Sequence, residues 1–518
     1  MAKTGNERLA EALRAASDAA VGNVLSSKSI TDKQRTLLVN KGYFKQIIRG
    51  WYLLDADLTT EKAGDSVLWY ESIWSFVGQY VESIFGDDYW LSPESSLDLH
   101  TANNALPNQI IVYTSDTTPR TLNLPNNMSM VIIKGRVPCK TVRVNGINVH
   151  SLESALVETG PQTFRANPIS IQLALRNADL SLLSEAVLTT KNVASGNRLI
   201  GAYQQLKMRA ESRKLQTIME GAGFEGIKQV NPFDHIPMIV GSSRGESPSA
   251  VRVRLLWQEM RQEVVEVFND FPPPFDFFER SIEKTHAMMS SLYISDAYNS
   301  LSIEGYKVTP ELIERLSKGG WSPDTIQRDK EQKDAMAARG YYDAFNKVKE
   351  LLREAHEDKE GLDIHYLIDV GLTDWFTALF NPCVDAGIIN RLDLAGFRKG
   401  PIYIRTSMHV PPSSEQLMDC MEALKELIAN EKYFVVKAIL GHLFLGYIHP
   451  FPDGNGRTAR FLMNFLLVIG GYPWTVIKLK NRTQYLSALE SASVGKNVKP
   501  FAEFIRQSMQ EVEHNISI

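Results

Sequence analysis

The residues best suited to chemistry lie in one twelve-residue segment, His449 to Arg460, with the sequence HPFPDGNGRTAR. Gly454 and Gly456 have no side chains, so anionic oxygens can approach their backbone N–H groups closely. Asp453 beside them is a carboxylate that suits a Mg²⁺ ion bridging two phosphates. These residue types at this spacing predict a site for a polyphosphate and its metal ion.

Two further features of the segment fit the same chemistry. Arg457 and Arg460 are three residues apart, on one helix face, where both can reach one polyphosphate. His449 titrates ordinarily near neutral pH and could accept a proton from an attacking hydroxyl. Taken singly, the histidine would more often be structural, the GNG a turn and the arginines a helix surface. Their occurrence within one loop favours the functional interpretation.

Apolar segments on both sides must position this loop. AILGHLFLGYI precedes it and TARFLMNFLLVI follows it, which predicts a loop between two buried helices. The loop ends at the N-terminus of the second helix, where unpaired N–H groups and the helix dipole favour an anion. The chain has no GxxxxGK[ST] motif, which argues against a P-loop ATPase.

The segment matches the Fic-domain signature H-x-F-x-D/E-G-N-G-R-x-x-R at every specified position, and the resemblance extends over most of residues 250–518. It implies an all-helical domain that transfers AMP from ATP to a Ser, Thr or Tyr hydroxyl of a protein, the chain itself included. ATP and Mg²⁺ or Mn²⁺ are the implied cofactors. Gly456 stands where the kinase-like Doc branch usually has lysine, which favours AMP transfer.

The resemblance also implies a role for each residue of the motif. His449 is the general base, and Asp453 binds the metal. The remaining implied contacts are those of Gly454, Asn455 and Gly456 with the α- and β-phosphates, of Arg457 and Arg460 with the outer phosphates, and of Phe451 with the core beneath the loop.

An inhibitory element is implied upstream, on a helix expected at about residues 285–305. Ser300 and Glu304 lie one helical turn apart and match the family motif S/T-x-x-x-E-G/N. The resemblance implies that Glu304 pairs with Arg460 and blocks the position of the ATP γ-phosphate, since a carboxylate and a phosphate compete for one guanidinium. A Glu-Gly pair is also common at helix ends. Glu304 could alternatively position water for removal of AMP from a modified protein.

Two other segments resemble parts of the family. Residues 395–405, with the alternating run PIYIR, are expected to form a β-hairpin like the Fic flap, which holds the target by strand addition. An ordinary surface hairpin is the alternative, and His409 is expected to be structural at its base. Tyr485 either stacks on the adenine base or packs in the core, and both interpretations stay open.

The start of the chain contains a local basic segment. Residues 31–40 predict a short helix, a glycine turn follows at residues 41–42, and YFKQIIRGWYLL predicts a β wing. Between residues 28 and 49 one acid, Asp32, stands against six cations: Lys28, Lys33, Arg35, Lys41, Lys45 and Arg49. Such a face could neutralise DNA phosphates, although a solvated helix face is the simpler alternative.

This region also resembles a known family. LVNKGYFKQIIRGWYLL, LSPESSLDLHTANNALPNQIIVYTS and INVHSLESALVE occur in the order found in winged-helix regulators of the AbiEi antitoxin type, over residues 8–157. The resemblance implies a winged helix followed by a mixed α/β domain, with DNA as a partner. It gives a rival hypothesis, in which the protein is a DNA-binding regulator of toxin–antitoxin type and its Fic half senses nucleotide.

Composition sets the outer bounds. The 518 residues are 44% hydrophobic and 22% charged, with a formal net charge of −4, which excludes a wholly basic nucleic-acid binder. Three cysteines without a CxxC motif exclude a disulfide framework and a zinc finger. A signal peptide and an apolar run of membrane-spanning length are not evident, so we expect a cytoplasmic protein with no membrane partner.

These observations predict an α+β protein. We expect a winged-helix-like domain at residues 1–60, an AbiEi-like α/β domain at 61–185, a helical connection and linker at 186–249, and a helical Fic domain with a hairpin flap at 250–518. Both the monomer and an oligomer remain open.

Overall fold

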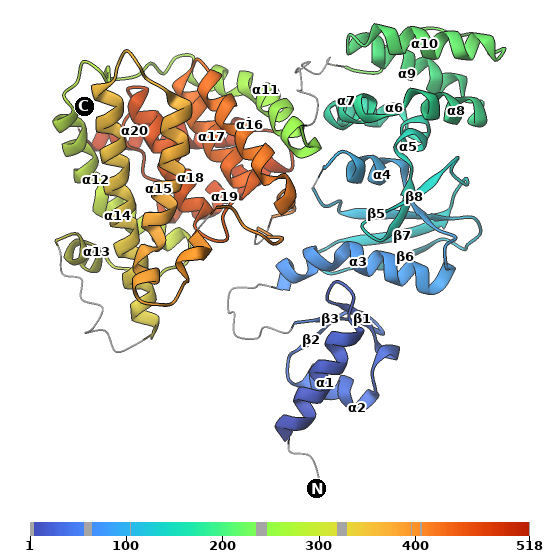
Figure 1. The fold of residues 1–518 in the computed structure, drawn as a ribbon, viewed down its shortest axis with the longest axis horizontal. Coiled ribbons are helices and arrows are strands. Elements are labelled where there is room, and N and C mark those ends of the chain that lie inside the picture. The colour runs from blue at the N-terminus through green and yellow to red at the C-terminus, as the bar shows by residue number, and fades with distance from the viewer. Residues whose placement is uncertain are drawn as a thin grey trace. The chain divides into compact units, whose positions relative to one another are not determined.

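The computed structural model describes residues 5–55, 65–103, 105–234, 246–318, 329–394, 396–404 and 407–516. The chain divides into two compact units (Figure 1). Unit 1 comprises Met1–Ile239 and Tyr403–Val410, and unit 2 comprises Val240–Ile402 and Pro411–Ile518. Unit 1 contains strands and helices, whereas the described part of unit 2 is helical, so the predicted α+β class is confirmed.

Unit 1 begins with a small helix-and-sheet element. It consists of α1 (Gly5–Ala19), β1 (Val24–Ser26), the 3₁₀ turn η1 (Ser27–Ser29), α2 (Asp32–Asn40), β2 (Phe44–Ile48) and β3 (Trp51–Leu54), with the strands antiparallel in the order β1-β3-β2. Thr31 and Gln34 form a capping box that starts α2. Gly42 and Gly50 have positive φ angles, which the two tight turns require. The predicted order of a short helix, a glycine turn and β structure is present.

A mixed sheet follows in unit 1. Its elements are α3 (Asp65–Phe85), β4 (Trp90–Leu91), α4 (Pro93–His100), β5 (Gln109–Thr114), β6 (Arg120–Asn123) and β7 (Ser129–Lys134), then the hairpin of β8 (Thr141–Val144) and β9 (Ile147–His150). The sheet order is β4-β5-β7-β6, with β5 and β7 parallel. Both β5 and β7 consist mainly of β-branched and other apolar residues, as strands commonly do. Alternate side chains such as Ile110 and Val112 are fully buried, as a one-sided sheet requires.

A helical bundle completes unit 1. It contains α5 (Leu152–Glu158), α6 (Pro161–Ala166), α7 (Pro168–Asn177), α8 (Leu180–Thr190), α9 (Val193–Gln205) and α10 (Arg209–Gly221). The boundary expected at residue 185 falls inside α8, and Leu183 and Val187 on either side of it share one apolar core. That boundary does not separate two folded parts, because the helices bury their apolar faces together. Residues 235–245 of the expected linker lie outside the described residues.

Unit 2 is built of helices. They are α11 (Pro248–Phe268), α12 (Ile282–Ile303), α13 (Pro310–Ser317), α14 (Asp329–Glu357), α15 (Ile364–Asp385), α16 (Leu417–Asn430), α17 (Phe434–Ile448), α18 (Asn455–Ile469), α19 (Arg482–Ser493) and α20 (Lys499–Ile516), with 3₁₀ turns η3 (Arg391–Leu394), η4 (Ser414–Gln416) and η5 (Leu479–Asn481). α17 and α18 are buried along nearly their whole length, which explains their apolar sequences. No helix within the described ranges is both long and apolar enough to cross a membrane.

Residues 396–404, the described part of the hairpin expected at residues 395–405, form no strands. Residues 401–404 have no regular secondary structure, and Ala395 and Arg405 lie outside the described residues. Within unit 1, the apolar side chains of Tyr403, Met408 and Val410 pack against the core of the mixed sheet. His409 is buried and forms an isolated bridge with Ala105. Of these side chains, Tyr403 belongs to the segment that was expected to form the hairpin, and it packs on the sheet core instead of pairing with a neighbouring strand.

A close helix contact in unit 2 gives a stability prediction. A Cβ atom on Gly340 of α14 would lie 2.1 Å from the backbone oxygen of Leu379 in α15. Gly340→Ala should therefore lower the free energy of unfolding by about 1–3 kcal/mol, as overpacking does. Urea unfolding followed by circular dichroism measures this. Gly446→Ala is the matched control, since a Cβ atom there meets nothing within 4 Å. Equal stability of the two variants would contradict the close packing of α14 on α15.

Candidate active site

The motif loop lies between two buried helices, as predicted. His449 caps the C-terminus of α17 in the left-handed region, with φ 51° and ψ 58°. Gly454 precedes α18 with φ 79°, and its carbonyl oxygen accepts the first helical hydrogen bond, from Thr458 N at 2.9 Å. The backbone N–H groups at the start of α18 therefore lie at the end of the loop, where an anion would find donors.

Asn455 fixes the shape of the loop. Its Oδ1 accepts a hydrogen bond from Phe451 N at 2.9 Å, and its Nδ2 donates to Phe451 O at 2.7 Å. Phe451 is buried and stacks on Phe376 with ring centroids 4.2 Å apart, which is the packing beneath the loop that the sequence led us to expect. Both polar atoms of the Asn455 side chain thus bond to the backbone of Phe451 and hold the loop in its shape.

The two glycines are required by close neighbours. A Cβ atom on Gly454 would lie 2.9 Å from Cε2 of Phe380, and one on Gly456 would lie 2.3 Å from Oε1 of Glu304. Distances this short exclude ordinary side chains unless the neighbour moves. The carboxylate of Glu304 therefore lies directly against the backbone that was predicted to receive phosphate.

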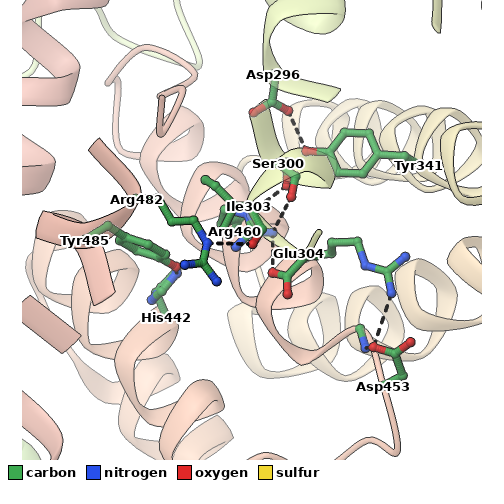
Figure 2. Close-up of polar contacts among 12 residues, drawn as sticks. Asp296, Ser300, Ile303, Glu304, Tyr341, His442, Asp453, Arg460, Arg482 and Tyr485 are labelled. Atoms are coloured by element: carbon green, nitrogen blue, oxygen red, sulfur yellow. Dashed lines mark hydrogen bonds and ion pairs between the residues drawn. The ribbon is translucent and has the colours of Figure 1, made fainter. Parts of the chain in front are cut away.

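Glu304 forms the ion pair expected with Arg460 (Figure 2). Nη2 of Arg460 lies 2.7 Å from Oε1 of Glu304 and 3.1 Å from the backbone oxygen of Ser300, and Nε donates to Ser300 Oγ at 2.8 Å. The Arg460 side chain is 4% exposed and that of Glu304 is 34% exposed. Ser300 and Glu304 thus act on the guanidinium from one helix face.

The end of α12 holds Glu304 in place. Glu304 is the C-cap residue, and Gly305 follows with φ 88°, so the common helix-end pattern and the ion pair occur together. Arg482 Nε donates to the backbone oxygen of Ile303 at 2.9 Å, and Asn299 Oδ1 accepts from Leu479 N at 2.7 Å. Sequence reasoning missed both contacts, since an exposed arginine and an asparagine have no diagnostic spacing.

Tyr485 packs in the core. It is buried, and its hydroxyl lies 2.8 Å from Nε2 of His442 (Figure 2). The rings of Phe501 and Phe504 lie next to it, with centroids 6.2 and 5.8 Å away. This geometry favours the core-packing alternative over stacking on adenine, because the side chain is buried among other aromatic rings.

Tyr341 and Asp296 form a second polar pair near Arg460. The Tyr341 hydroxyl donates to Oδ2 of Asp296 at 2.7 Å, and both side chains are buried. Burial raises the pKa of Asp296 to about 6, against the opposing effects of its hydrogen bonds and of Arg460. These residues belong to the surroundings of the arginine that the motif pattern could not reveal.

Arg457 is buried with an unsatisfied donor. Its guanidinium lies 5.1 Å from the ring centroids of both Tyr306 and Phe380, and Nη2 is 3.5 Å from Oδ1 of Asp453. Among the residues that the structure describes, Nε of Arg457 has no hydrogen-bond partner. A buried cation with an orphaned donor suits an anionic ligand, as the implied contact with an outer phosphate requires.

His449 is in the protonation state that a base needs. It is half-buried, and its Nδ1 lies 3.2 Å from the backbone oxygen of Gly446. An Nδ1–H donated to that carbonyl leaves Nε2 as the acceptor. Burial, with the charge of Arg398, lowers the pKa of His449 to about 4, although the Gly446 carbonyl, Glu304 and Asp453 act in the opposite direction. The imidazole is therefore neutral at physiological pH.

Asp453 fits the implied metal in one respect. Its side chain is 60% exposed, and Oδ1 accepts a hydrogen bond from Gly454 N at 2.6 Å. Within the described residues, no group of three or more His, Cys, Asp and Glu side chains could hold a metal ion. Mg²⁺ commonly binds to one or two carboxylates together with substrate phosphates and water, so a single accessible carboxylate beside the loop is compatible with it.

Comparison with known proteins identifies the region around the motif. Residues 380–467 match the Fic/DOC family model. The chain contains a Fic domain. Proteins named "Protein adenylyltransferase Fic" from Nematostella vectensis and Drosophila mojavensis are 36% and 37% identical to it over 123 residues. Those residues are 23% of this chain, and they span only 28% and 24% of the two relatives.

Solved structures are similar over longer stretches at lower identity. Fic-1 from C. elegans is 17% identical, with a TM-score of 0.38, over 67% of this chain and 91% of that chain. A Fic-domain-containing signaling protein from Bacteroides thetaiotaomicron is 18% identical, with a TM-score of 0.36, over 51% of this chain and 94% of that chain. The assignment of the Fic domain rests on the sequence matches.

The surroundings of His449 predict its titration. In the folded protein the ring should titrate near pH 4, below its ordinary value of 6.5, mainly because burial disfavours the imidazolium. The pH dependence of the ring carbon signals in ¹³C-histidine NMR measures this, with the signal assigned by its loss in His449→Asn. Since the unfolded state binds more protons in this window, stability should fall as pH falls from 6.5 towards 4. A midpoint at 6 or above would contradict the burial of the ring.

Proposed function

We propose that this protein transfers AMP from ATP to a Ser, Thr or Tyr hydroxyl of a protein target and that Glu304 restrains the reaction. One observation carries the proposal: the carboxylate of Glu304 lies against the backbone of Gly456 and pairs with buried Arg460. The names of the relatives that match the Fic domain support AMP transfer. The geometry of the loop supports binding of a polyphosphate there.

Each residue of the loop has a separate role in the proposed reaction. Neutral His449 accepts the hydroxyl proton at Nε2, and the hydroxyl oxygen forms a bond to the α-phosphorus of ATP while the bond to the β-phosphate oxygen breaks. Pyrophosphate leaves with the electron pair. Arg457 and the N–H groups of α18 offset the charge of the phosphates. A Mg²⁺ ion held by Asp453 and the phosphates would supply further charge neutralisation when bound.

The restraint follows from competition for one cation. A carboxylate at 2.7 Å from Arg460 Nη2 occupies the donor that an outer phosphate would use. It also places a negative charge against the N-terminal turn of α18, where phosphate oxygens would lie. ATP therefore binds in a productive position only when Glu304 leaves Arg460.

The restraint predicts a gain of activity. Incubated with ATP labelled at the α-phosphate, Glu304→Gly should label itself or a target protein at least about tenfold more than wild type, a change equivalent to about 1.4 kcal/mol. Glu314→Gly, on the exposed face of the next helix, is the matched control and should leave labelling unchanged. The label is measured by gel autoradiography and located by mass spectrometry.

The same assay tests the base. Adding His449→Ala to Glu304→Gly should reduce labelling by about 10²-fold or more, which is within the contribution of a positioned base. Equal labelling with and without His449 would rule out the mechanism. If Glu304→Gly labels a target that accepts AMP no more than the wild-type protein does, the restraint by Glu304 is ruled out.

We also propose that the first part of unit 1 acts as a winged helix of the AbiEi type that binds DNA. One observation favours it: Lys28, Lys33, Lys41 and Arg49, on and around α2 and the wing, are exposed. The other two cations of the segment are paired, Arg35 with Asp32 at 2.7 Å and Lys45 with Asp55 at 2.9 Å. The exposed charges are the ones that remain to meet phosphates.

DNA binding predicts a salt-dependent affinity. Fluorescence anisotropy with a labelled duplex of the protein's own promoter should show binding at 50 mM salt that weakens steeply as salt rises. The double variant Lys33→Glu and Lys41→Glu should abolish binding, whereas Lys134→Glu, on the mixed sheet of unit 1, should not. Failure of the wild-type protein to bind at low salt would remove this second function.

A further inference from the structure

The side chain of Arg398 binds backbone carbonyl groups of two segments, the motif loop and the residues around 400 and 412. It is 6% exposed, and its Nε donates to the backbone oxygen of His449 at 2.8 Å. Nη2 reaches the backbone oxygen of Ile448 at 3.5 Å. The backbone N–H of Arg398 itself donates to Pro450 O at 2.9 Å. Three consecutive carbonyl groups at the start of the loop are therefore held by one residue.

The same guanidinium binds residues on both sides of segment 401–411, of which residues 401–405 were likened to part of the Fic flap. Nη1 donates to the backbone oxygen of Gly400 at 2.8 Å, and Nη2 donates to that of Pro412. All of these residues belong to unit 2. Residues 403–410 belong to unit 1, whereas Gly400 and Pro412, on either side of them in sequence, belong to unit 2. Arg398 ties both of these to the backbone of the histidine.

The chemistry of these bonds explains why an arginine is used. The last carbonyl groups of a helix have no partner within it. The guanidinium of Arg398 donates to the carbonyl group of Ile448, the last residue of α17, and to that of the C-cap His449, and its charge complements the helix dipole. A planar guanidinium offers five donors in fixed directions, whereas a lysine offers a single ammonium group. His449 has a left-handed backbone that a non-glycine residue adopts only when its surroundings hold it there.

We propose that Arg398 is a positioning residue, which fixes the backbone of His449 relative to both ends of the 401–411 segment. The inference rests on the proposed AMP transfer, in which His449 must lie within hydrogen-bond reach of the target hydroxyl. A small displacement of the base lowers the rate of the chemical step without changing how ATP binds. Arg398 acts through the histidine and does not itself contact the nucleotide.

The charge of Arg398 also acts on the histidine. The groups that influence the ring are the buried surroundings and Arg398, which favour the neutral form, and the Gly446 carbonyl, Glu304 and Asp453, which favour the charged form. A variant that removes the charge should raise the pKa of His449. A variant that keeps the charge but loses the planar guanidinium should lower the rate of AMP transfer. It should leave the pKa of His449 close to that of the parent protein.

The test compares two variants in the Glu304→Gly background. Arg398→Lys should lower the rate of AMP transfer at saturating ATP about tenfold or more, with KM for ATP within about twofold. Arg398→Gln should lower the rate at least as much and also shift the NMR titration of His449 to higher pH. Arg506→Lys is the matched control, because Arg506 likewise donates to a backbone carbonyl, that of Val267, at the far end of α11. It should change neither quantity.

Each outcome decides the proposal. A folded Arg398→Lys variant with the rate of its parent overturns it. A loss of the helical circular dichroism signal at 25 °C in Arg398→Lys, but not in Arg506→Lys, also overturns it, since Arg398 would then serve the fold. If the parent variant Glu304→Gly transfers no AMP, the proposed function is refuted. The titration of His449 then still tests whether Arg398 lies beside the histidine. An unchanged titration in Arg398→Gln contradicts that placement.

Discussion

The guanidinium of Arg460 is buried inside unit 2, and a buried cation requires a counter-charge. Glu304 supplies it at 2.7 Å, and Ser300 satisfies two of the remaining donor contacts. Arg460 lies on the outgoing helix of the motif, whereas Ser300 and Glu304 lie at the end of α12, so the ion pair joins two segments far apart in sequence. The position of α12 relative to the motif loop depends on this contact.

Under the proposed function, the ion pair gives Glu304 two roles. Its carboxylate would block the site when no nucleotide is bound, and it neutralises the buried guanidinium of Arg460. An outer phosphate of ATP carries the same charge and could take over both contacts. Gly456 allows either anion to lie against the backbone, because it has no side chain to occupy that space. In the proposed reaction, restraint by Glu304 and binding of ATP are thus alternative ways of satisfying one buried charge.

The sequence predicted the parts of this site that depend on local spacing. The loop between apolar helices, the packing of Phe451 and the partner of Glu304 could be predicted because each follows from a short pattern or from a family motif. The hairpin expected at residues 395–405 is not formed by residues 396–404, which are the described part of that segment. Tyr403 packs instead against the sheet of unit 1, a long-range contact that local alternation cannot predict. The core position of Tyr485 and the carbonyl contacts of Arg398 depend on residues distant in sequence. No local spacing encodes them.

Thermal unfolding of Glu304→Gly, with and without ATP and Mg²⁺, tests the shared counter-charge most directly. Without nucleotide, the variant should melt below wild type, since Arg460 loses the partner that offsets its burial. ATP should then raise the melting temperature of the variant by more than it raises that of wild type, because the phosphate replaces the missing carboxylate. A variant that melts at or above wild type without nucleotide, and gains no more from ATP, would contradict the competition for Arg460.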